Sequence, residues 1–117
     1  MSTQDVNDWI GKTVNNNDIV LFMKGRKGMP QCGFSQQVDY ILTELLGVEY
    51  KDINVLDDAA VRDGVKAYSN WPTIPQLYVK GEFVGGCDIV REMYEAGELQ
   101  EMLTEKGIKH NAGSEVC

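Results

Sequence analysis

Residues 19–46 read IVLFMKGRKGMPQCGFSQQVDYILTELL and contain a strand pattern, a cysteine and a helix pattern in direct succession. Ile19–Met23 is a run of five apolar residues, which is typical of a strand covered on both faces. From residue 36 to residue 46 the apolar residues recur at helical spacing, and Gly47 ends the pattern. Cys32 is therefore expected just ahead of a helix, in the loop that follows the central strand of a sheet.

The segments on either side continue the alternation of helices and strands. An apolar stripe ends at the cluster Asn15-Asn16-Asn17-Asp18, so a first helix is expected to end near residue 15. After the quoted stretch, a short strand is expected at 50–54, followed by a helix that the pair Asp57-Asp58 can cap. The stripes of these two helices are Val6, Trp9, Ile10 and Val14, and Val61, Val65 and Tyr68.

The C-terminal half adds a hairpin and two helices. Apolar runs at 76–80 and 83–85 flank Gly81, which predicts a tight antiparallel hairpin. Helical stripes follow at about 88–96 and 98–106, separated at Gly97. This order predicts an α/β domain with a four-stranded mixed sheet flanked by helices, the plan of a thioredoxin-like domain. Periodicity alone leaves other three-layer α/β plans open.

Composition limits the class of protein. The 117 residues suit one domain, expected at 1–108, with a polar, unpatterned tail at 109–117 that is expected to be flexible. The net charge of −7 argues against nucleic acid as a partner. No apolar stretch approaches the roughly 20 residues of a membrane span, and the N-terminus lacks a basic region followed by an apolar one. Three widely spaced cysteines do not form the paired framework of a small secreted domain, so a reducing compartment is expected.

Cys32 is the candidate reactive group. A thiol ahead of a helix faces unpaired N–H groups and the positive end of the helix dipole, both of which favour the thiolate. Lys24 and Lys27 precede it and are expected to add positive potential. The alternative for any lone cysteine is a buried small hydrophobe, and this is our interpretation of Cys87 and Cys117.

Ser35 limits what the Cys32 thiol can do. The spacing Cys32-Gly33-Phe34-Ser35 puts a hydroxyl where a Cys-x-x-Cys pair would carry its second thiol, so no disulfide can close within the motif. A second thiol must therefore come from elsewhere. A 2Fe-2S cluster commonly needs four thiolates, which two chains and two external thiols would supply.

Two further motifs predict a binding surface. Thr73-Ile74-Pro75 precedes a strand, where a cis proline would turn the Ile74 amide toward the thiol; an ordinary trans proline is the alternative. Gly85-Gly86-Cys87-Asp88 combines close backbone approach with a helix start and so predicts a cradle for a carboxylate; a simple turn capped by Asp88 is the alternative.

Lys24 and Arg62 are candidates for binding a second carboxylate. A lysine or arginine side chain pairs readily with a carboxylate group, although each of the two residues equally suits a solvated surface charge.

Together, the motifs Cys32-Gly33-Phe34-Ser35, Trp71-Pro72-Thr73-Ile74-Pro75-Gln76 and Gly85-Gly86-Cys87-Asp88 resemble those of the monothiol glutaredoxins of the CGFS type. The resemblance runs from about residue 5 to residue 106 and is closest to the single-domain members of bacteria and mitochondria. It implies the thioredoxin-like glutaredoxin fold, with Pro75 in the cis form. It further implies a homodimer that bridges one 2Fe-2S cluster, in which each chain binds one glutathione.

The resemblance also assigns roles to individual residues. Cys32 would be both the reactive thiol and the cluster ligand. The glutathione contacts that the resemblance implies are Lys24 and Arg62 for the glycyl carboxylate, Ile74 for the cysteinyl unit, and Cys87 and Asp88 for the γ-glutamyl unit, with Gly86 as a further contact. Phe34 would lie beside the ligand sulfur, and Thr73 and Pro75 would shape the groove.

The implied role is iron-sulfur cluster carriage and iron homeostasis, with iron-sulfur client proteins and a BolA-like protein as partners. The implied compartment is the bacterial cytoplasm or the mitochondrial matrix. The alternative is a glutathione-dependent oxidoreductase that removes glutathione from mixed disulfides through Cys32, for which the resemblance implies weak activity at most. A third class, an interaction module without a redox centre, requires Cys32 to be inert.

Overall fold

The central feature of the fold is a four-stranded mixed sheet, as expected. The computed structural model describes residues 3–111. The strands are β1 (Ile19–Met23), β4 (Lys51–Asn54), β5 (Gln76–Val79) and β6 (Glu82–Gly85), in the order β4-β1-β5-β6. β1 is parallel to β4 and antiparallel to β5, and β5 is antiparallel to β6.

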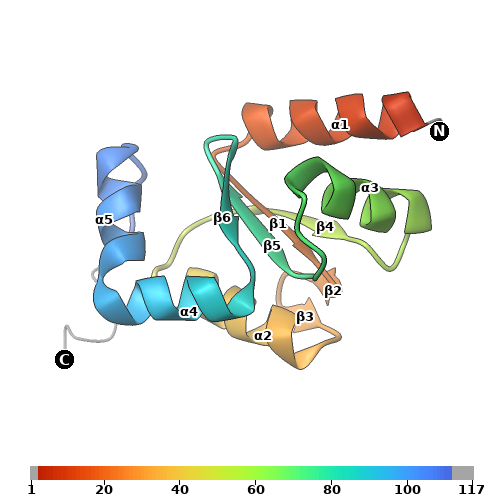
Figure 1. Ribbon diagram of the computed structural model, residues 1–117. Coiled ribbons are helices and arrows are strands. Elements are labelled where there is room, and N and C mark those ends of the chain that lie inside the picture. The colour runs from red at the N-terminus through yellow and green to blue at the C-terminus, as the bar shows by residue number, and fades with distance from the viewer. Residues whose placement is uncertain (1–2, 112–117) are drawn as a thin grey trace.

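Helices cover both faces of this sheet (Figure 1). α1 (Thr3–Asn16) and α3 (Ala59–Ser69) lie on one face, and α2 (Gly33–Tyr40) and α4 (Cys87–Ala96) lie on the other. A π-helical segment, η1 (Ile41–Leu45), continues α2, and α5 (Glu98–Glu105) follows α4. No helix of residues 3–111 is both long and apolar enough to cross a membrane.

β1 contributes to the hydrophobic core on both faces, which explains its unbroken apolar run. Because successive side chains of a strand point to opposite faces, Leu21 packs into the cluster under α2, α4 and α5. Val20 and Phe22 pack into the cluster under α1 and α3. All five β1 residues are at most 2% exposed. By contrast, Trp9 of the α1 stripe is 37% exposed, because Val6, Ile10 and Val14 already face the sheet.

The helix after Cys32 starts three residues earlier than its apolar stripe indicates, and its C-terminal part is π-helical rather than α-helical. Gly33 begins α2, with Cys32 as its N-cap residue. Residues 41–45 of the expected helix form η1, where the Leu46 N–H donates to the Ile41 carbonyl at 2.9 Å. Gly47 has a φ of +62°, as a glycine stop requires.

A small hairpin, which the sequence pattern did not indicate, connects β1 to Cys32. β2 (Gly25–Arg26) pairs with β3 (Met29–Pro30) in an antiparallel arrangement. Gly25 has a φ of +100°, and a Cβ on it would lie 2.6 Å from the Gln31 nitrogen. Only glycine fits there. Strands of two residues are too short to produce a periodic pattern, so this segment looked like a loop.

Two helix starts differ in how they are capped. Asp58 is the N-cap of α3 and accepts from the Ala60 and Val61 N–H groups, so one of the two expected aspartates has this role. Asp88 does not cap α4: Gly86 is the N-cap, and Asp88 lies in the first helical turn. The carboxylate there still interacts favourably with the positive end of the helix dipole.

The part of the expected tail that the structure describes contacts the domain. The Asn111 N–H donates to the Leu46 carbonyl at 2.7 Å, just after η1. Residues 112–117, including Cys117, lie outside the described residues.

Candidate functional site

Cys32 lies at the N-terminal end of α2 and is partly exposed. Burial raises the pKa of its thiol, but the opposing effects are together larger and the pKa lies below its usual value. These effects are the backbone N–H groups of Ser35 and Phe34, the charge of Lys24 and the Ser35 hydroxyl. The expectation that the helix start favours the thiolate is thereby supported.

Lys24 and Ser35 are connected to each other as well as to Cys32. The Lys24 N–H donates to the Ser35 Oγ at 3.0 Å, and the Ser35 side chain is fully buried. Lys27 does not contribute to the pKa of the thiol, contrary to expectation. Its Nζ lies 3.7 Å from a Glu49 carboxylate oxygen and 4.6 Å from the centre of the Tyr50 ring, on the side of β4.

Cys32 opens onto a surface depression that we call the thiol groove. It brings six of the expected site residues together: Lys24, Cys32, Phe34, Arg62, Thr73 and Ile74. The remaining lining residues are Leu56, Asp63, Lys66 and Pro72. Phe34, expected beside the thiol, is 58% exposed.

The cations of the thiol groove differ in how free they are. The Arg62 Nε lies 3.4 Å from an Asp63 carboxylate oxygen. Neither Lys24 nor Lys66 forms an ion pair with another residue of 3–111. Lys66 was not among the site residues expected from the sequence, although it follows Arg62 by four residues and therefore lies on the same face of α3.

A second depression, the α4 pocket, adjoins the thiol groove. The two share Phe34, Thr73 and Ile74, so they form one continuous surface. The α4 pocket is further lined by Trp71, Pro75, Gly86, Cys87, Asp88 and Ile89. The Ile74–Pro75 peptide bond is cis, as expected.

The start of α4 offers backbone N–H groups to this pocket. The first-turn amides of a helix have no acceptor within the helix. A Cβ at Gly86 would lie 3.3 Å from both the Pro75 carbonyl oxygen and the Trp71 Nε1, so glycine allows the helix start to approach the cis-proline loop closely. The Asp88 carboxylate lies 3.3 Å from the Arg91 Nη1. The start of α4 therefore places first-turn N–H groups and one carboxylate, Asp88, at the α4 pocket.

Cys87 is the second cysteine of the site, and its environment differs from that of Cys32. It is 7% exposed, and its Sγ lies 3.4 Å from the Gln37 Oε1. Burial raises the pKa of the Cys87 thiol, and the charges of Asp88 and Cys32 add to this, while Arg91 opposes it. Cys32 and Cys87 are both free thiols. The structure agrees with the interpretation of the Cys87 side chain as a small buried group.

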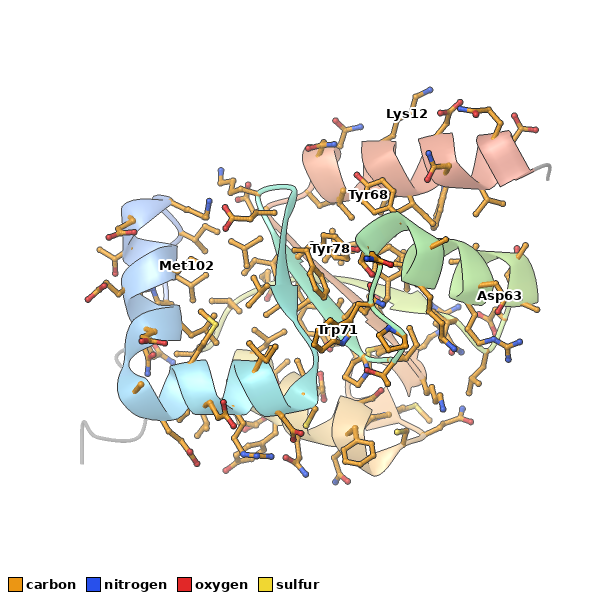
Figure 2. The ribbon with its side chains drawn as sticks, viewed as in Figure 1. Lys12, Asp63, Tyr68, Trp71, Tyr78 and Met102 are labelled. Atoms are coloured by element: carbon orange, nitrogen blue, oxygen red, sulfur yellow. The ribbon has the colours of Figure 1, made fainter. Side chains whose placement is uncertain are left out.

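Gln76 supports the loop between the two depressions. Its Nε2 donates to the Trp71 carbonyl at 3.0 Å and to the Thr73 carbonyl at 3.2 Å. Its Oε1 accepts from the Tyr78 hydroxyl. Trp71 and Tyr78 both contact the Phe83 ring of β6, and both are labelled in Figure 2. A buried amide thus fixes the backbone that carries Thr73, Ile74 and Pro75.

The donors available to a metal are few. No group of three or more His, Cys, Asp or Glu side chains comes together within residues 3–111. Cys32 is suited to be one ligand, because its thiol is partly exposed and its pKa is lowered.

A thiol at a helix start, beside a cis-proline loop on a four-stranded mixed sheet, defines a thioredoxin-like thiol protein. Residues 19–84 match the sequence profile of the family described as Glutaredoxin. The chain belongs to the glutaredoxin family, and within it to the monothiol glutaredoxins.

Similar proteins come from bacteria and from plastids. "Probable monothiol glutaredoxin 2" of Rickettsia conorii is 58% identical over 81% of this chain and 88% of its own length. The ycf64-like monothiol glutaredoxin of Synechocystis is 58% identical over 80% of this chain and 87% of its own. The chloroplastic monothiol glutaredoxin-S14 of Arabidopsis thaliana is 52% identical over 85% of this chain and 57% of its own length.

Solved structures of glutaredoxins have the same fold. Reduced apo GrxS14 of poplar superposes with a TM-score of 0.78 at 47% identity, covering 90% of this chain and 96% of the other. A buckwheat glutaredoxin in complex with glutathione superposes with a TM-score of 0.80 at 27% identity, covering 92% and 94%.

Proposed function

We propose that this monothiol glutaredoxin binds glutathione and, as a homodimer, a bridging 2Fe-2S cluster that it carries to other proteins, with a role in iron homeostasis. The observation on which this rests is the thiol groove, where one activated thiol, Cys32, lies beside the cations Lys24, Arg62 and Lys66. Ser35 leaves this thiol without a partner in its own motif.

Glutathione matches the adjoining depressions in chemistry and in order. Its glycyl carboxylate suits the cations Lys24 and Arg62, to which the structure adds Lys66. Its cysteinyl backbone suits pairing with the Ile74 backbone, between the two depressions. Its γ-glutamyl carboxylate suits the start of α4 at Gly86 and Cys87, and its ammonium suits Asp88. A glutaredoxin of buckwheat is known in complex with glutathione, which supports the assignment.

The cluster follows from counting thiolates. A 2Fe-2S cluster needs about four thiolate ligands. Cys32 supplies one per chain, and one glutathione per chain supplies another, so two chains complete the set. In this arrangement the protein holds the glutathione thiol beside Cys32, and the cluster is cargo.

Anaerobic reconstitution with iron, sulfide and glutathione tests the proposal. We expect wild type to give a coloured dimer, measured by visible absorption and size exclusion, and Cys32→Ser to give neither colour nor dimer. Cys117→Ser is the control, because no role is assigned to that thiol, and it should assemble the cluster like wild type. Assembly by Cys32→Ser, or assembly without glutathione, would show that the ligand set is wrong.

A second function is supported by the lowered pKa of Cys32. The Cys32 thiolate can attack the glutathione sulfur of a protein mixed disulfide, which releases the protein thiolate and leaves glutathione on Cys32. The thiolate of a second glutathione then attacks that disulfide, which frees Cys32 and yields oxidised glutathione. Rapid turnover of a glutathionylated protein would favour this enzyme over the carrier.

For partners and location, we propose iron-sulfur client proteins, a BolA-like partner and a reducing compartment such as the bacterial cytoplasm or the mitochondrial matrix. The support is the family and the free thiols Cys32 and Cys87.

A further inference from the structure

The β2–β3 hairpin joins two residues of the thiol site, Lys24 and Cys32, and three side chains outside it accept hydrogen bonds from its backbone N–H groups. The Gly25 N–H donates to the Asn54 Oδ1 at 2.9 Å, and the Lys27 N–H donates to the Asp52 Oδ2 at 2.9 Å. Both acceptors belong to β4. The third contact comes from α2, where Asp39 accepts from the Gly28 N–H at 3.3 Å.

Asp39 is the unusual member of this set, because it is a carboxylate with only 7% exposure. Burying a charged or polar group is unfavourable unless hydrogen bonds compensate for the lost water. Here one carboxylate oxygen accepts from Gly28, and the other accepts from the Tyr50 hydroxyl at 2.5 Å. Burial raises the pKa of Tyr50, and Asp39 raises it further, so this hydroxyl remains a donor.

Neither Asp39 nor Tyr50 lines the thiol groove or the α4 pocket. Their effect on the site must therefore pass through the hairpin. The Gln31 N–H donates to the Lys24 carbonyl at 2.9 Å and closes the base of the hairpin, next to Cys32. The Lys24 N–H in turn donates to the Ser35 Oγ at 3.0 Å, and Lys24 and Cys32 both line the thiol groove.

We propose that Asp39, held by Tyr50, is a positioning residue: it anchors the β2–β3 hairpin and so keeps Lys24 in place beside Cys32 and the glutathione carboxylate. The glutathione part of this inference rests on the proposed function. The anchoring of the hairpin does not, and it is measured without ligand.

Two substitutions test the anchor. Tyr50→Phe removes the hydroxyl, and Asp39→Asn replaces the acceptor of the Gly28 N–H by a group that also carries donors. We expect hydrogen exchange at the hairpin amides to become about tenfold faster or more, because a hydrogen bond to a charged acceptor is lost. Alkylation of Cys32 at neutral pH, located by mass spectrometry, should slow, and the glutathione dissociation constant should rise several-fold.

Ile10→Val is the matched control, since it loosens the core between α1 and the sheet and leaves the hairpin untouched. It should leave hydrogen exchange at the hairpin amides and the rate of Cys32 alkylation unchanged. This outcome distinguishes a positioning role of Asp39 and Tyr50 from a general loss of stability. The decisive comparison is between the Cys32 alkylation rates of two variants: Lys24→Met alone, and Lys24→Met combined with Tyr50→Phe. If Tyr50 acts through Lys24, the double variant should alkylate no more slowly than Lys24→Met alone.

The inference would be overturned if Lys24→Met and Tyr50→Phe slowed Cys32 alkylation additively. It would also be overturned if hydrogen exchange at the hairpin amides were unchanged in a folded Tyr50→Phe variant. If wild type does not bind glutathione, the proposed function is wrong. The positioning role of Asp39 is then decided by two measurements that need no glutathione. These are hydrogen exchange at the hairpin amides and Cys32 alkylation rates in the single and double variants.

Discussion

At the scale of single residues, the chemistry of this protein depends on what surrounds one sulfur atom. Cys32 and Cys87 have the same side chain, yet the pKa of the first thiol is lowered and that of the second is raised. Helix-start N–H groups and the Lys24 charge outweigh burial at Cys32. At Cys87 burial dominates, and the nearest carboxylate, Asp88, acts in the same direction.

We expect Lys24→Met to raise the pKa of the Cys32 thiol, because it removes a positive charge while the Ser35 and Phe34 N–H groups remain. The pH dependence of Cys32 alkylation measures this directly. Lys12→Met is the control, since Lys12 points to solvent from α1 (Figure 2). An unchanged alkylation profile in Lys24→Met would contradict the prediction.

The lowered pKa of the Cys32 thiol also makes the free energy of unfolding depend on pH. Because the pKa of the Cys32 thiol is lower in the folded state, the thiolate adds stability above the unfolded-state pKa. That contribution is lost as the pH falls through the folded-state pKa. Unfolding of Lys24→Met should therefore show a smaller gain in stability toward alkaline pH than wild type.

Lys66 should matter for glutathione more than Arg62 does, because Arg62 already faces Asp63. We expect Lys66→Met to raise the glutathione dissociation constant about two- to fivefold, the usual range for an exposed ion pair. Arg62→Met should have a smaller effect. Calorimetric titration of both variants decides the order, and the reverse order would show that glutathione displaces Asp63 from Arg62.

At the scale of elements, short segments between the regular ones carry the site. The cis-proline loop is fixed by Gln76, the start of α2 presents Cys32, and Gly86 brings α4 close to the loop. The Gln76 side chain donates to two carbonyls of the cis-proline loop, which keeps this loop in shape at the surface without strand pairing.

Gly86→Ala tests the close approach of α4. The backbone at Gly86, with φ −94°, is open to alanine, so any effect comes from the added Cβ, 3.3 Å from the Pro75 carbonyl oxygen. We expect a loss of about 1 to 3 kcal/mol in the free energy of unfolding and weaker glutathione binding. Gly11→Ala is the control, because its Cβ would make only an ordinary contact 3.7 Å from the Tyr68 hydroxyl oxygen. If Gly86→Ala binds glutathione with wild-type affinity, glutathione does not contact this part of the α4 pocket.

At the scale of the whole molecule, a positive groove lies on an acidic protein. The net charge is −7, yet the thiol groove contains Lys24, Arg62 and Lys66 against a single carboxylate, Asp63. Local potential in a depression therefore differs from the net charge, and this face suits an anionic ligand such as the proposed glutathione.

We expect the two core clusters to unfold as one cooperative unit, because β1 contributes side chains to both. Leu21→Ala should lower the free energy of unfolding by about 2 to 5 kcal/mol, because Leu21 is fully buried. Tryptophan fluorescence, from Trp9 on α1 and Trp71 in the loop, and far-UV circular dichroism should follow one urea transition. Two separate transitions would show that the layers unfold independently.

Much of this architecture could be predicted from local patterns. The central strand, the helix after Cys32, the Asp58 cap and the β5–β6 hairpin each have a local signal in apolar periodicity or turn residues. The cis form of Pro75 and the composition of the groove followed from the family resemblance. The β2–β3 hairpin lacked such a signal, because two-residue strands have no period.

The sequence by itself determined the main helices and strands, the lone motif thiol and the family, because these depend on residue type and short-range spacing. Only the tertiary structure decided that Lys24, and not Lys27, lies near Cys32, that Lys66 joins the groove, and that Asp39 meets Tyr50 and Gly28. These contacts join residues from different elements. Their distances are set by how the helices and the hairpin pack on the sheet, and local spacing does not encode that packing.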